Sequence, residues 1–167
     1  HTPAEEADLA PQAPARRRLA YDEAFARALM LELTAEARRR LPATPLQGDG
    51  SLTQRLRAAL PYQPTGAQER AVADICADMA RTHPMLRLLM GDVGSGKTLV
   101  AAFAMVRAAE SGAQSALMAP TDLLARQHAA GLAPLLAAAG VTLEVLTGKT
   151  PASVRNRVLA GLADGSV

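Results

Sequence analysis

The sequence contains few aromatic residues and a single cysteine. None of its 167 residues is tryptophan, and only two tyrosines and two phenylalanines are present, so a surface for stacking nucleic-acid bases is not expected. Cys76 cannot form a disulfide within the chain, and a reducing cytoplasm is therefore the expected compartment. No apolar run approaches the roughly 18 residues that a membrane-spanning helix needs, so no contact with a membrane is expected.

The sequence also shows neither a signal peptide nor a large excess of one charge. The chain begins His1-Thr2-Pro3, and no basic segment followed by an apolar one is found there, which argues against a signal peptide. Because the first residue is not methionine, we expect the chain to have been cut from a longer protein. The 18 basic and 16 acidic residues give a net charge of +2, and residues 1–60 and 61–167 each carry nine basic and eight acidic side chains. This even distribution excludes a polybasic nucleic-acid tail but not phosphate contacts made by backbone amides.

Alanine and other apolar residues are abundant. Apolar residues make up 49% of the chain, which predicts a packed core, and the length is typical of one domain with an appendage. The 37 alanines blur helical periodicity, because alanine fits either face of a helix. Only two lysines, Lys97 and Lys149, stand among 16 arginines, so each lysine is informative.

The N-terminal part of the chain is predicted to be helical. Residues 1–15 mix proline, alanine and glutamate without periodicity, which indicates a linker. Residues 16–60 form a predicted helical arm. Apolar spacing in this arm predicts one helix from Arg16 to Arg40, and Ser51 opens a shorter helix with Gln54 placed for a capping box.

From residue 61 onward, helical patterns alternate with short apolar runs. The expected helices cover residues 65–81, 97–111 and 121–139, and a last one begins at Thr150-Pro151. The expected strands cover residues 86–90, 115–119 and 141–146. This alternation predicts an α/β fold, in which a parallel sheet carries helices on both faces and follows the helical arm.

One segment predicts nucleotide binding. Residues 91–98 match the pattern G-x-x-x-x-G-K-[ST], and they stand between a predicted strand and a predicted helix. The expected cofactor-binding residues of this phosphate cradle are Gly91, Asp92, Val93, Gly94, Ser95, Gly96, Lys97 and Thr98. Lys97 is expected to reach the β- and γ-phosphates of ATP, and the Thr98 hydroxyl to hold Mg²⁺, so these two are the expected catalytic residues.

A carboxylate that could orient metal and water is not evident in the sequence. The only Asp-Glu pair, Asp22-Glu23, precedes the cradle in a helical stretch, and no such pair follows Lys97. We therefore expect the chain to be truncated before this motif and, by itself, inactive as an ATP hydrolase.

Several motifs, in this order and spacing, resemble the RecG family of bacterial superfamily 2 helicases. They are Thr65-Gly66-Ala67-Gln68, the run from Met85 to Met90, the cradle, Met118-Ala119-Pro120-Thr121, and the run from Leu124 to His128. The resemblance implies that residues 61–167 form the N-terminal part of a RecA-like P-loop helicase lobe, truncated before its Walker B motif. It also implies that residues 16–60 join a wedge domain to this motor, because Arg16 to Glu23 is similar to the joining segment of the family.

The resemblance further implies roles for individual residues. Gln68 corresponds to a glutamine that recognises the nucleotide, although with Thr65 it also fits a capping box. Pro120 and Thr121 correspond to a motif that contacts phosphates of the tracked DNA strand, although Thr121 also fits an ordinary helix N-cap. A second DNA-binding clamp is implied at Thr147, Gly148 and Lys149.

The function implied by the resemblance is ATP-driven movement on branched DNA, in a bacterial cytoplasm at the nucleoid. ATP and Mg²⁺ are the implied cofactors, and stalled replication forks, Holliday junctions and single-strand binding protein are the implied partners. Three alternatives stay open, one of which is that this piece of chain only binds a nucleotide or DNA. The Mfd translocase, which couples transcription to repair, has a similar cradle but usually an aromatic residue where Ser95 stands. A small P-loop kinase would need an arginine-rich lid where the sequence has Ala119-Pro120-Thr121.

Overall fold

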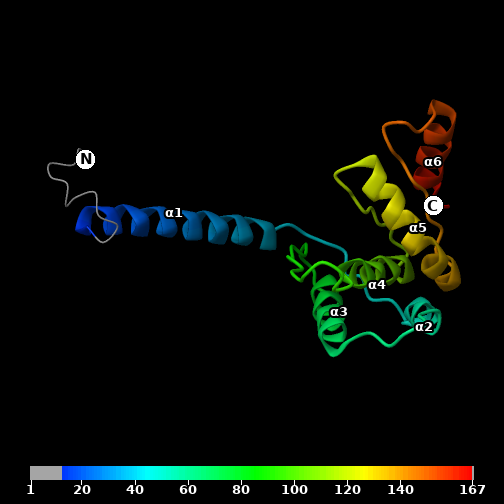
Figure 1. The fold of residues 1–167 in the computed structure, drawn as a ribbon, viewed down its shortest axis with the longest axis horizontal. Coiled ribbons are helices and arrows are strands. Elements are labelled where there is room, and N and C mark those ends of the chain that lie inside the picture. Colours follow the sequence, from blue (N-terminus) through cyan, green and yellow to red (C-terminus); the bar gives the residue numbers. More distant parts are fainter. Residues whose placement is uncertain (1–12, 167) are drawn as a thin grey trace. The chain divides into compact units, whose positions relative to one another are not determined.

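The computed structural model describes residues 13–166, which fall into two compact units, one ending at Ala43 and the other beginning at Thr44 (Figure 1). Most of the linker predicted at residues 1–15 lies outside the described residues, and Pro14 already begins a helix.

The described part of the first unit contains one helix, α1 (Pro14–Arg39), which confirms the predicted helix. Proline suits the first helical position, because its missing N–H would have no partner there. Arg18 Nε lies 3.1 Å from a carboxylate oxygen of Asp22, and the rings of Tyr21 and Phe25 stack with their centroids 6.2 Å apart. No residue of α1 is buried in the described structure, so pairs within the helix stabilise it rather than a core.

The second unit contains the remaining described helices, and each corresponds to a predicted one. They are α2 (Ser51–Ala58), α3 (Gly66–Met79), α4 (Lys97–Glu110), α5 (Asp122–Ala139) and α6 (Ala152–Asp164). Helix α4 packs against α2, α3 and α5, and α2 also packs against α5. Helix α4 is therefore the centre of the unit.

The core forms around α4, because this helix is apolar on several sides. Its buried residues are Leu99, Val100, Ala102, Phe103, Val106 and Ala108. They meet buried side chains of α2, α3 and α5, which are Leu56, Val72, Ile75, Leu132, Leu136 and Ala139. Burial of a large apolar side chain contributes about 1.5–3 kcal/mol, so this cluster fixes the position of α4.

The capping box predicted at Ser51 and Gln54 is wrong. Gly50, with φ of +84°, is the N-cap residue of α2, and Ser51 is already helical. The Ser51 amide donates instead to a carboxylate oxygen of Asp49 at 2.9 Å, and this bond contributes most to lowering the pKa of Asp49. Glycine accepts this left-handed conformation without strain, which serine does not.

A buried carboxylate from α4 completes the start of α2. Glu110 Oε1 accepts a hydrogen bond from the Thr53 amide at 2.6 Å, and the Glu110 side chain is 0% exposed. Arg107 Nη1 lies 3.5 Å from Glu110 Oε2 and donates to the Gly48 carbonyl at 2.7 Å. This Arg107–Glu110 pair ties the segment before α2 to the far end of α4.

The parallel sheet predicted from the sequence is wrong, because the described residues contain no strand. The segments predicted as strands, at residues 86–90, 115–119 and 141–146, have no regular structure. In the described part of the chain no backbone hydrogen bond joins one of them to another. A strand requires a neighbouring backbone to pair with, and an apolar run does not itself supply that partner.

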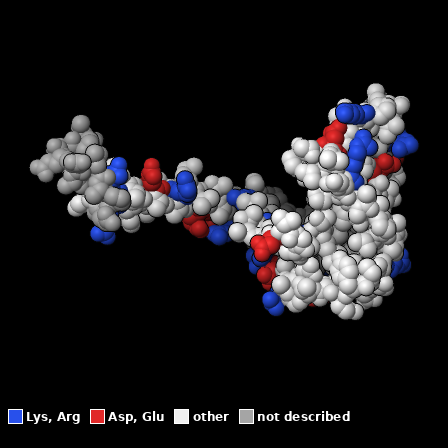
Figure 2. All heavy atoms as spheres, viewed as in Figure 1, with Lys and Arg blue, Asp and Glu red and all other residues white. Residues whose placement is uncertain are grey.

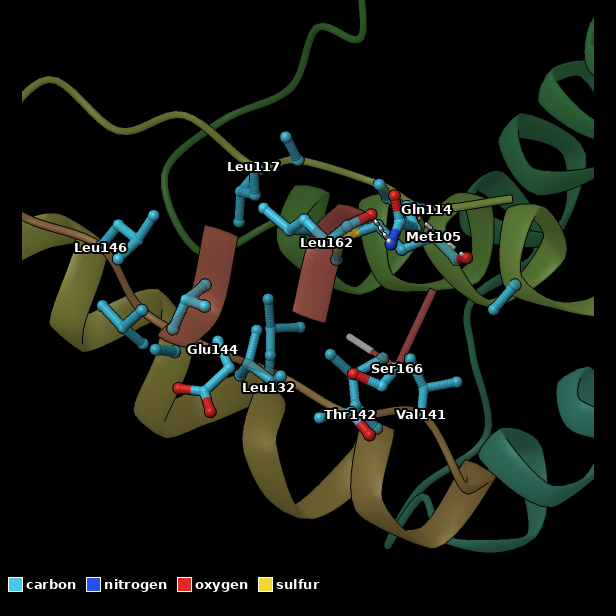
Figure 3. Close-up of a pocket in the computed structure, with 18 of the residues that line it drawn as sticks. Met105, Gln114, Leu117, Leu132, Val141, Thr142, Glu144, Leu146, Leu162 and Ser166 are labelled. Atoms are coloured by element: carbon cyan, nitrogen blue, oxygen red, sulfur yellow. Dashed lines mark hydrogen bonds between the residues drawn. The ribbon is translucent and has the colours of Figure 1, made fainter. Parts of the chain in front are cut away.

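Two of these segments contribute to a cavity between helices in place of a sheet. Leu88 is 82% exposed and Met118 is 93% exposed. Residues 112–117 and 141–146 line a cavity of about 940 Å³ together with side chains of α4, α5 and α6 (Figure 3). There the Gln114 side-chain nitrogen donates to the Leu162 carbonyl of α6 at 3.0 Å. Ser115 Oγ donates to the Met105 carbonyl of α4 at 3.4 Å, and Glu144 accepts from Arg157 of α6 at 3.3 Å, so residues of two of the segments bond to helices.

None of the helices described here is both long and apolar enough to cross a membrane.

Candidate functional site

The phosphate cradle, residues 91–98, is a tight loop that leads into α4. Gly94 and Gly96 have φ of +79° and +78°, in the left-handed region that favours glycine. Gly96 is the N-cap residue of α4, and the first turn of this helix inserts Leu99 and Val100 into the core. The buried start of α4 therefore fixes where the loop ends.

Lys97 folds back over the cradle. Its Nζ donates to the carbonyls of Gly91 and Asp92, both at 2.7 Å, and lies 3.4 Å from Ser95 Oγ. A Cβ at Gly91 would lie 2.7 Å from Ser95 Oγ, so a side chain there would require the Ser95 hydroxyl to move. The ammonium group is thereby held by the loop itself.

The cradle residues fit the phosphates of a nucleotide. The amides of Gly94, Gly96, Lys97 and Thr98 donate to no acceptor among the residues that the structure describes. The first amides of a helix have no partner within it, and the N-terminal end of the helix dipole is positive. Free amides beside an ammonium group are the donors that a phosphate chain requires. Thr98, partly exposed in the first turn of α4, is the residue that would hold Mg²⁺.

Gln68 caps α3 and braces the cradle. The Gln68 side-chain Oε1 accepts from the Thr65 backbone amide at 2.8 Å, and the Gln68 backbone amide donates to Thr65 Oγ1 at 3.3 Å. These two bonds confirm the capping box. Its Nε2 donates to the Ser95 carbonyl at 2.9 Å. It also lies so close to Gly96 that a side chain there would collide with it.

The two segments expected to contact DNA meet in one groove, which we call the clamp groove. This cavity of about 390 Å³ is lined by residues 117–122, Ala125, residues 146–148 and Arg155. Pro120 and Thr121 therefore share a surface with Thr147 and Gly148. Lys149 follows directly and is exposed.

One side of the clamp groove is the start of α5. Thr121 is the N-cap residue, and its Oγ1 accepts from the Leu124 amide at 3.3 Å, which confirms the N-cap interpretation. The amides of Asp122 and Leu123 donate to no acceptor in the described part of the chain. This end of α5 can therefore donate to an anion.

The other side is a turn in which Thr147 is 7% exposed. Its hydroxyl accepts from the Lys149 amide at 3.3 Å, and its amide donates to Thr150 Oγ1 at 2.8 Å. The Thr147 hydroxyl is therefore hydrogen-bonded within the turn. Gly148 and Lys149 are the residues of the turn that are exposed.

Arg155, near the start of α6, is a member of this groove that sequence reasoning missed. Its Nη2 donates to the Thr147 carbonyl at 2.8 Å, and its side chain is partly buried. The sequence places both Arg155 and Arg157 shortly after the clamp, but only the structure distinguishes which of them faces it. Basic side chains, with acidic ones among them, gather at the end of the second unit where α5 begins and α6 lies (Figure 2).

The cradle and the clamp groove stand at the starts of two helices that pack on each other. The cradle leads into α4, and the groove contains the first residue of α5. The contact between these helices belongs to the buried core, to which α4 contributes Phe103 and α5 contributes Leu136. The two sites are thus connected by helices that share one buried core.

The chain is similar to curated helicases of the RecG type. It is 50% identical over 157 residues to "ATP-dependent DNA helicase RecG" of Escherichia coli, which is 93% of this chain and 22% of that protein. It is 42% identical over 154 residues to the protein of the same name from Haemophilus influenzae, with 92% and 22% covered. The chain thus spans about a fifth of the length of these relatives.

A solved structure and a family model agree with this similarity. A chain described as "Structure of RecG bound to three-way DNA junction" matches with a TM-score of 0.75 and 37% identity, over 89% of this chain and 20% of that one. These matches confirm the resemblance to RecG. The model of the DEAD/DEAH box helicase family matches residues 65–164, which is more than half of the sequence. The chain therefore belongs to the DEAD/DEAH box helicase family.

Proposed function

We propose that this chain is part of an ATP-dependent DNA helicase of the RecG type, which remodels stalled replication forks and Holliday junctions. The 50% identity to RecG over 93% of the chain carries this proposal. Residues 61–167 would supply the first part of the motor, and residues 16–60 would join it to a wedge domain. The RecG relatives favour this function over an Mfd-like translocase or a small-molecule kinase.

ATP and Mg²⁺ are the cofactors that we propose. The amides of the cradle and the Lys97 ammonium would hold the β- and γ-phosphates, and Gln68 would brace the loop that receives them. Mg²⁺, when bound, neutralises charge on the phosphate oxygens. Thr98 would be its protein ligand.

Branched DNA is the partner that we propose for the clamp groove. Pro120 and Thr121 at the start of α5, with Gly148 and Lys149 in the opposite turn, would contact phosphates, and Thr147 would shape that turn. Phosphate contacts carry no base information, so binding would not depend on sequence. A change at the cradle would reach the groove through the packing of α4 on α5. We propose the bacterial cytoplasm, at the nucleoid, as the compartment, and single-strand binding protein as a further partner.

The proposal is tested by replacing Lys97 in the full-length protein. We expect Lys97→Ala to abolish ATP turnover stimulated by a three-way DNA junction, because no other side chain of the cradle supplies a positive charge. Phosphate release is measured with and without the junction. Arg157→Ala is the matched control, because Arg157 is exposed and lines neither site.

Two outcomes would contradict the proposal. Turnover by Lys97→Ala above roughly a tenth of the wild-type rate, a loss of less than about 1.4 kcal/mol in transition-state stabilisation, would contradict the role of the cradle. ATP turnover by the wild-type protein that does not respond to DNA would favour a small-molecule kinase.

A further inference from the structure

We infer that Arg155 binds a DNA phosphate in the clamp groove and supplies the positive charge among the residues that line it, with Lys149 next to the groove. This inference rests on the proposed function, since it assigns a further contact to the same groove. The resemblance to RecG did not identify Arg155. The residue emerges from its position beside both clamp segments.

The geometry leaves most of the Arg155 guanidinium available. A guanidinium group carries five N–H donors in a fixed plane. Within the described structure, the Arg155 side chain makes one hydrogen bond, from Nη2 to the Thr147 carbonyl. This bond anchors the side chain at the turn, so the remaining donors are held beside the groove at a lower entropic cost than those of a free surface arginine.

A phosphate bound in the clamp groove needs a positively charged side chain beside it. Among the residues lining the groove, the ionised side chains are those of Asp122 and Arg155. Asp122 suits the first turn of α5, because a negative charge there favours the helix dipole, but it repels a phosphate. No ion pair within 4.0 Å joins Asp122 to Arg155 in the described structure, so the guanidinium charge is not consumed by that carboxylate. Without Arg155 the groove would present amides and hydroxyls beside a net negative charge.

Helix α6 also provides a matched arginine outside the groove. Arg157 lies two residues further on, and residues at this spacing point to different sides of a helix. Its side chain is 68% exposed, and its Nη2 lies 3.3 Å from Glu144 Oε1. Arg155 and Arg157 therefore have the same chemistry on the same helix and differ in whether they face the clamp.

The salt dependence of DNA binding tests the assignment. Each phosphate neutralised on duplex DNA contributes about 0.9 to the slope of log affinity against log salt concentration. The full-length protein is titrated with a fluorescent three-way junction at several KCl concentrations, and anisotropy gives the affinity. We expect R155Q to reduce the magnitude of the slope by about 0.9, whereas R155K and R157Q keep the wild-type slope. Equivalently, a fourfold reduction in salt should strengthen wild-type binding about 3.5-fold more than it strengthens R155Q binding.

The outcomes separate a phosphate contact from a structural role. R155Q removes the charge and keeps an N–H donor, although on a side chain too short to occupy the position of Arg155 Nη2, and R155K tests whether a longer charged side chain restores the slope. A weaker R155Q with an unchanged slope would show that Arg155 acts only through the turn, and the inference would be overturned. An equal loss of slope in R157Q would overturn it as well. Should R155Q fail to fold by circular dichroism, R155M is the second neutral variant, with the same expected slope. A wild-type protein that does not bind the junction would instead refute the proposed function.

Discussion

Several side chains in the second unit each connect two elements. Gln68 caps α3 and braces the cradle, and Arg57 of α2 donates to both carboxylate oxygens of Glu69 in α3, one of them at 2.7 Å. The same guanidinium lies 4.9 Å from the centroid of the Phe103 ring in α4. A planar cation of this kind suits a bidentate bond on one edge and an aromatic contact on its face.

The Arg57–Glu69 pair makes stability depend on pH. The hydrogen bond from Arg57 lowers the pKa of Glu69 below its ordinary value of 4.5. A carboxyl group with a lowered folded pKa stabilises the fold above that ordinary value, and this stabilisation is lost as pH falls through the lowered pKa. We expect Glu69→Gln to reduce the loss of stability between about pH 5 and pH 3, by a small amount because the pair is partly exposed.

Urea unfolding of the chain at each pH measures this effect. Arg57→Met should flatten the pH profile in the same way, and the double variant should add nothing further, because both changes remove one interaction. Parallel profiles for the wild type and Glu69→Gln would show that this pair does not link stability to pH.

At the scale of elements, α2 depends on a carboxylate that lies far away in the sequence. Glu110 accepts from the Thr53 amide and pairs with Arg107 while fully buried. We expect Glu110→Ala to lower the free energy of unfolding by about 3 kcal/mol, because it leaves Arg107 partly buried without its partner. Hydrogen exchange should show the loss of protection first at the Thr53 amide, and chemical denaturation gives the free energy.

Two further variants distinguish the charge pair from general packing. Glu110→Gln keeps an oxygen that can accept from Thr53 and should lose less stability than Glu110→Ala. The double replacement of Arg107 and Glu110 by methionine should recover part of the loss, since apolar residues can substitute for a buried ion pair. A Glu110→Ala variant with unchanged stability would contradict the capping role.

The helices and the unpaired segments show why some elements could be predicted from the sequence. Helix α3 depends on a local capping box, and α5 on a local N-cap, so the sequence around Thr65 and Thr121 contains the determining groups. The start of α2 depends on Glu110, which no local pattern reveals. The predicted strand at residues 86–90 would depend on a partner elsewhere in the chain, and an apolar run cannot specify one.

The candidate site also contains a part determined by local sequence and a part that depends on distant residues. The cradle could be predicted because its glycines and Lys97 are contiguous, and the positive φ values of Gly94 and Gly96 account for two of those glycines. The clamp groove combines residues from three segments. The resemblance to a family indicated two of these segments, whereas Arg155 became visible only when α6 placed it beside Thr147.

At the scale of the second unit, α4 connects the cradle, the core and the Arg107–Glu110 pair. It begins at the cradle, ends at the Arg107–Glu110 pair, and packs against α2, α3 and α5 between them. Helix α4 thus connects the cradle with both α5, where the clamp groove begins, and α2.

The lone cysteine of the chain provides a chemical measure of this packing. Cys76 is half-buried on α3 and packs against the core, and burial raises the pKa of its thiol. The thiolate is the nucleophile that attacks an alkylating reagent, so a thiol with a raised pKa that is also shielded reacts slowly. We expect iodoacetamide to modify Cys76 more slowly in the folded chain than in urea, with mass spectrometry following the reaction. Equal rates would show that α3 does not shield the thiol.

Because no second cysteine competes for the reagent, labelling reports on Cys76 alone, and the part of its rate that requires opening reflects movement of α3 away from the core. Helix α3 also holds Gln68 against the Ser95 carbonyl, so an opening of the whole helix would loosen the cradle. A nucleotide that binds only the closed cradle should therefore protect the cysteine in proportion to its concentration, and the chain would report its own occupancy without an attached label.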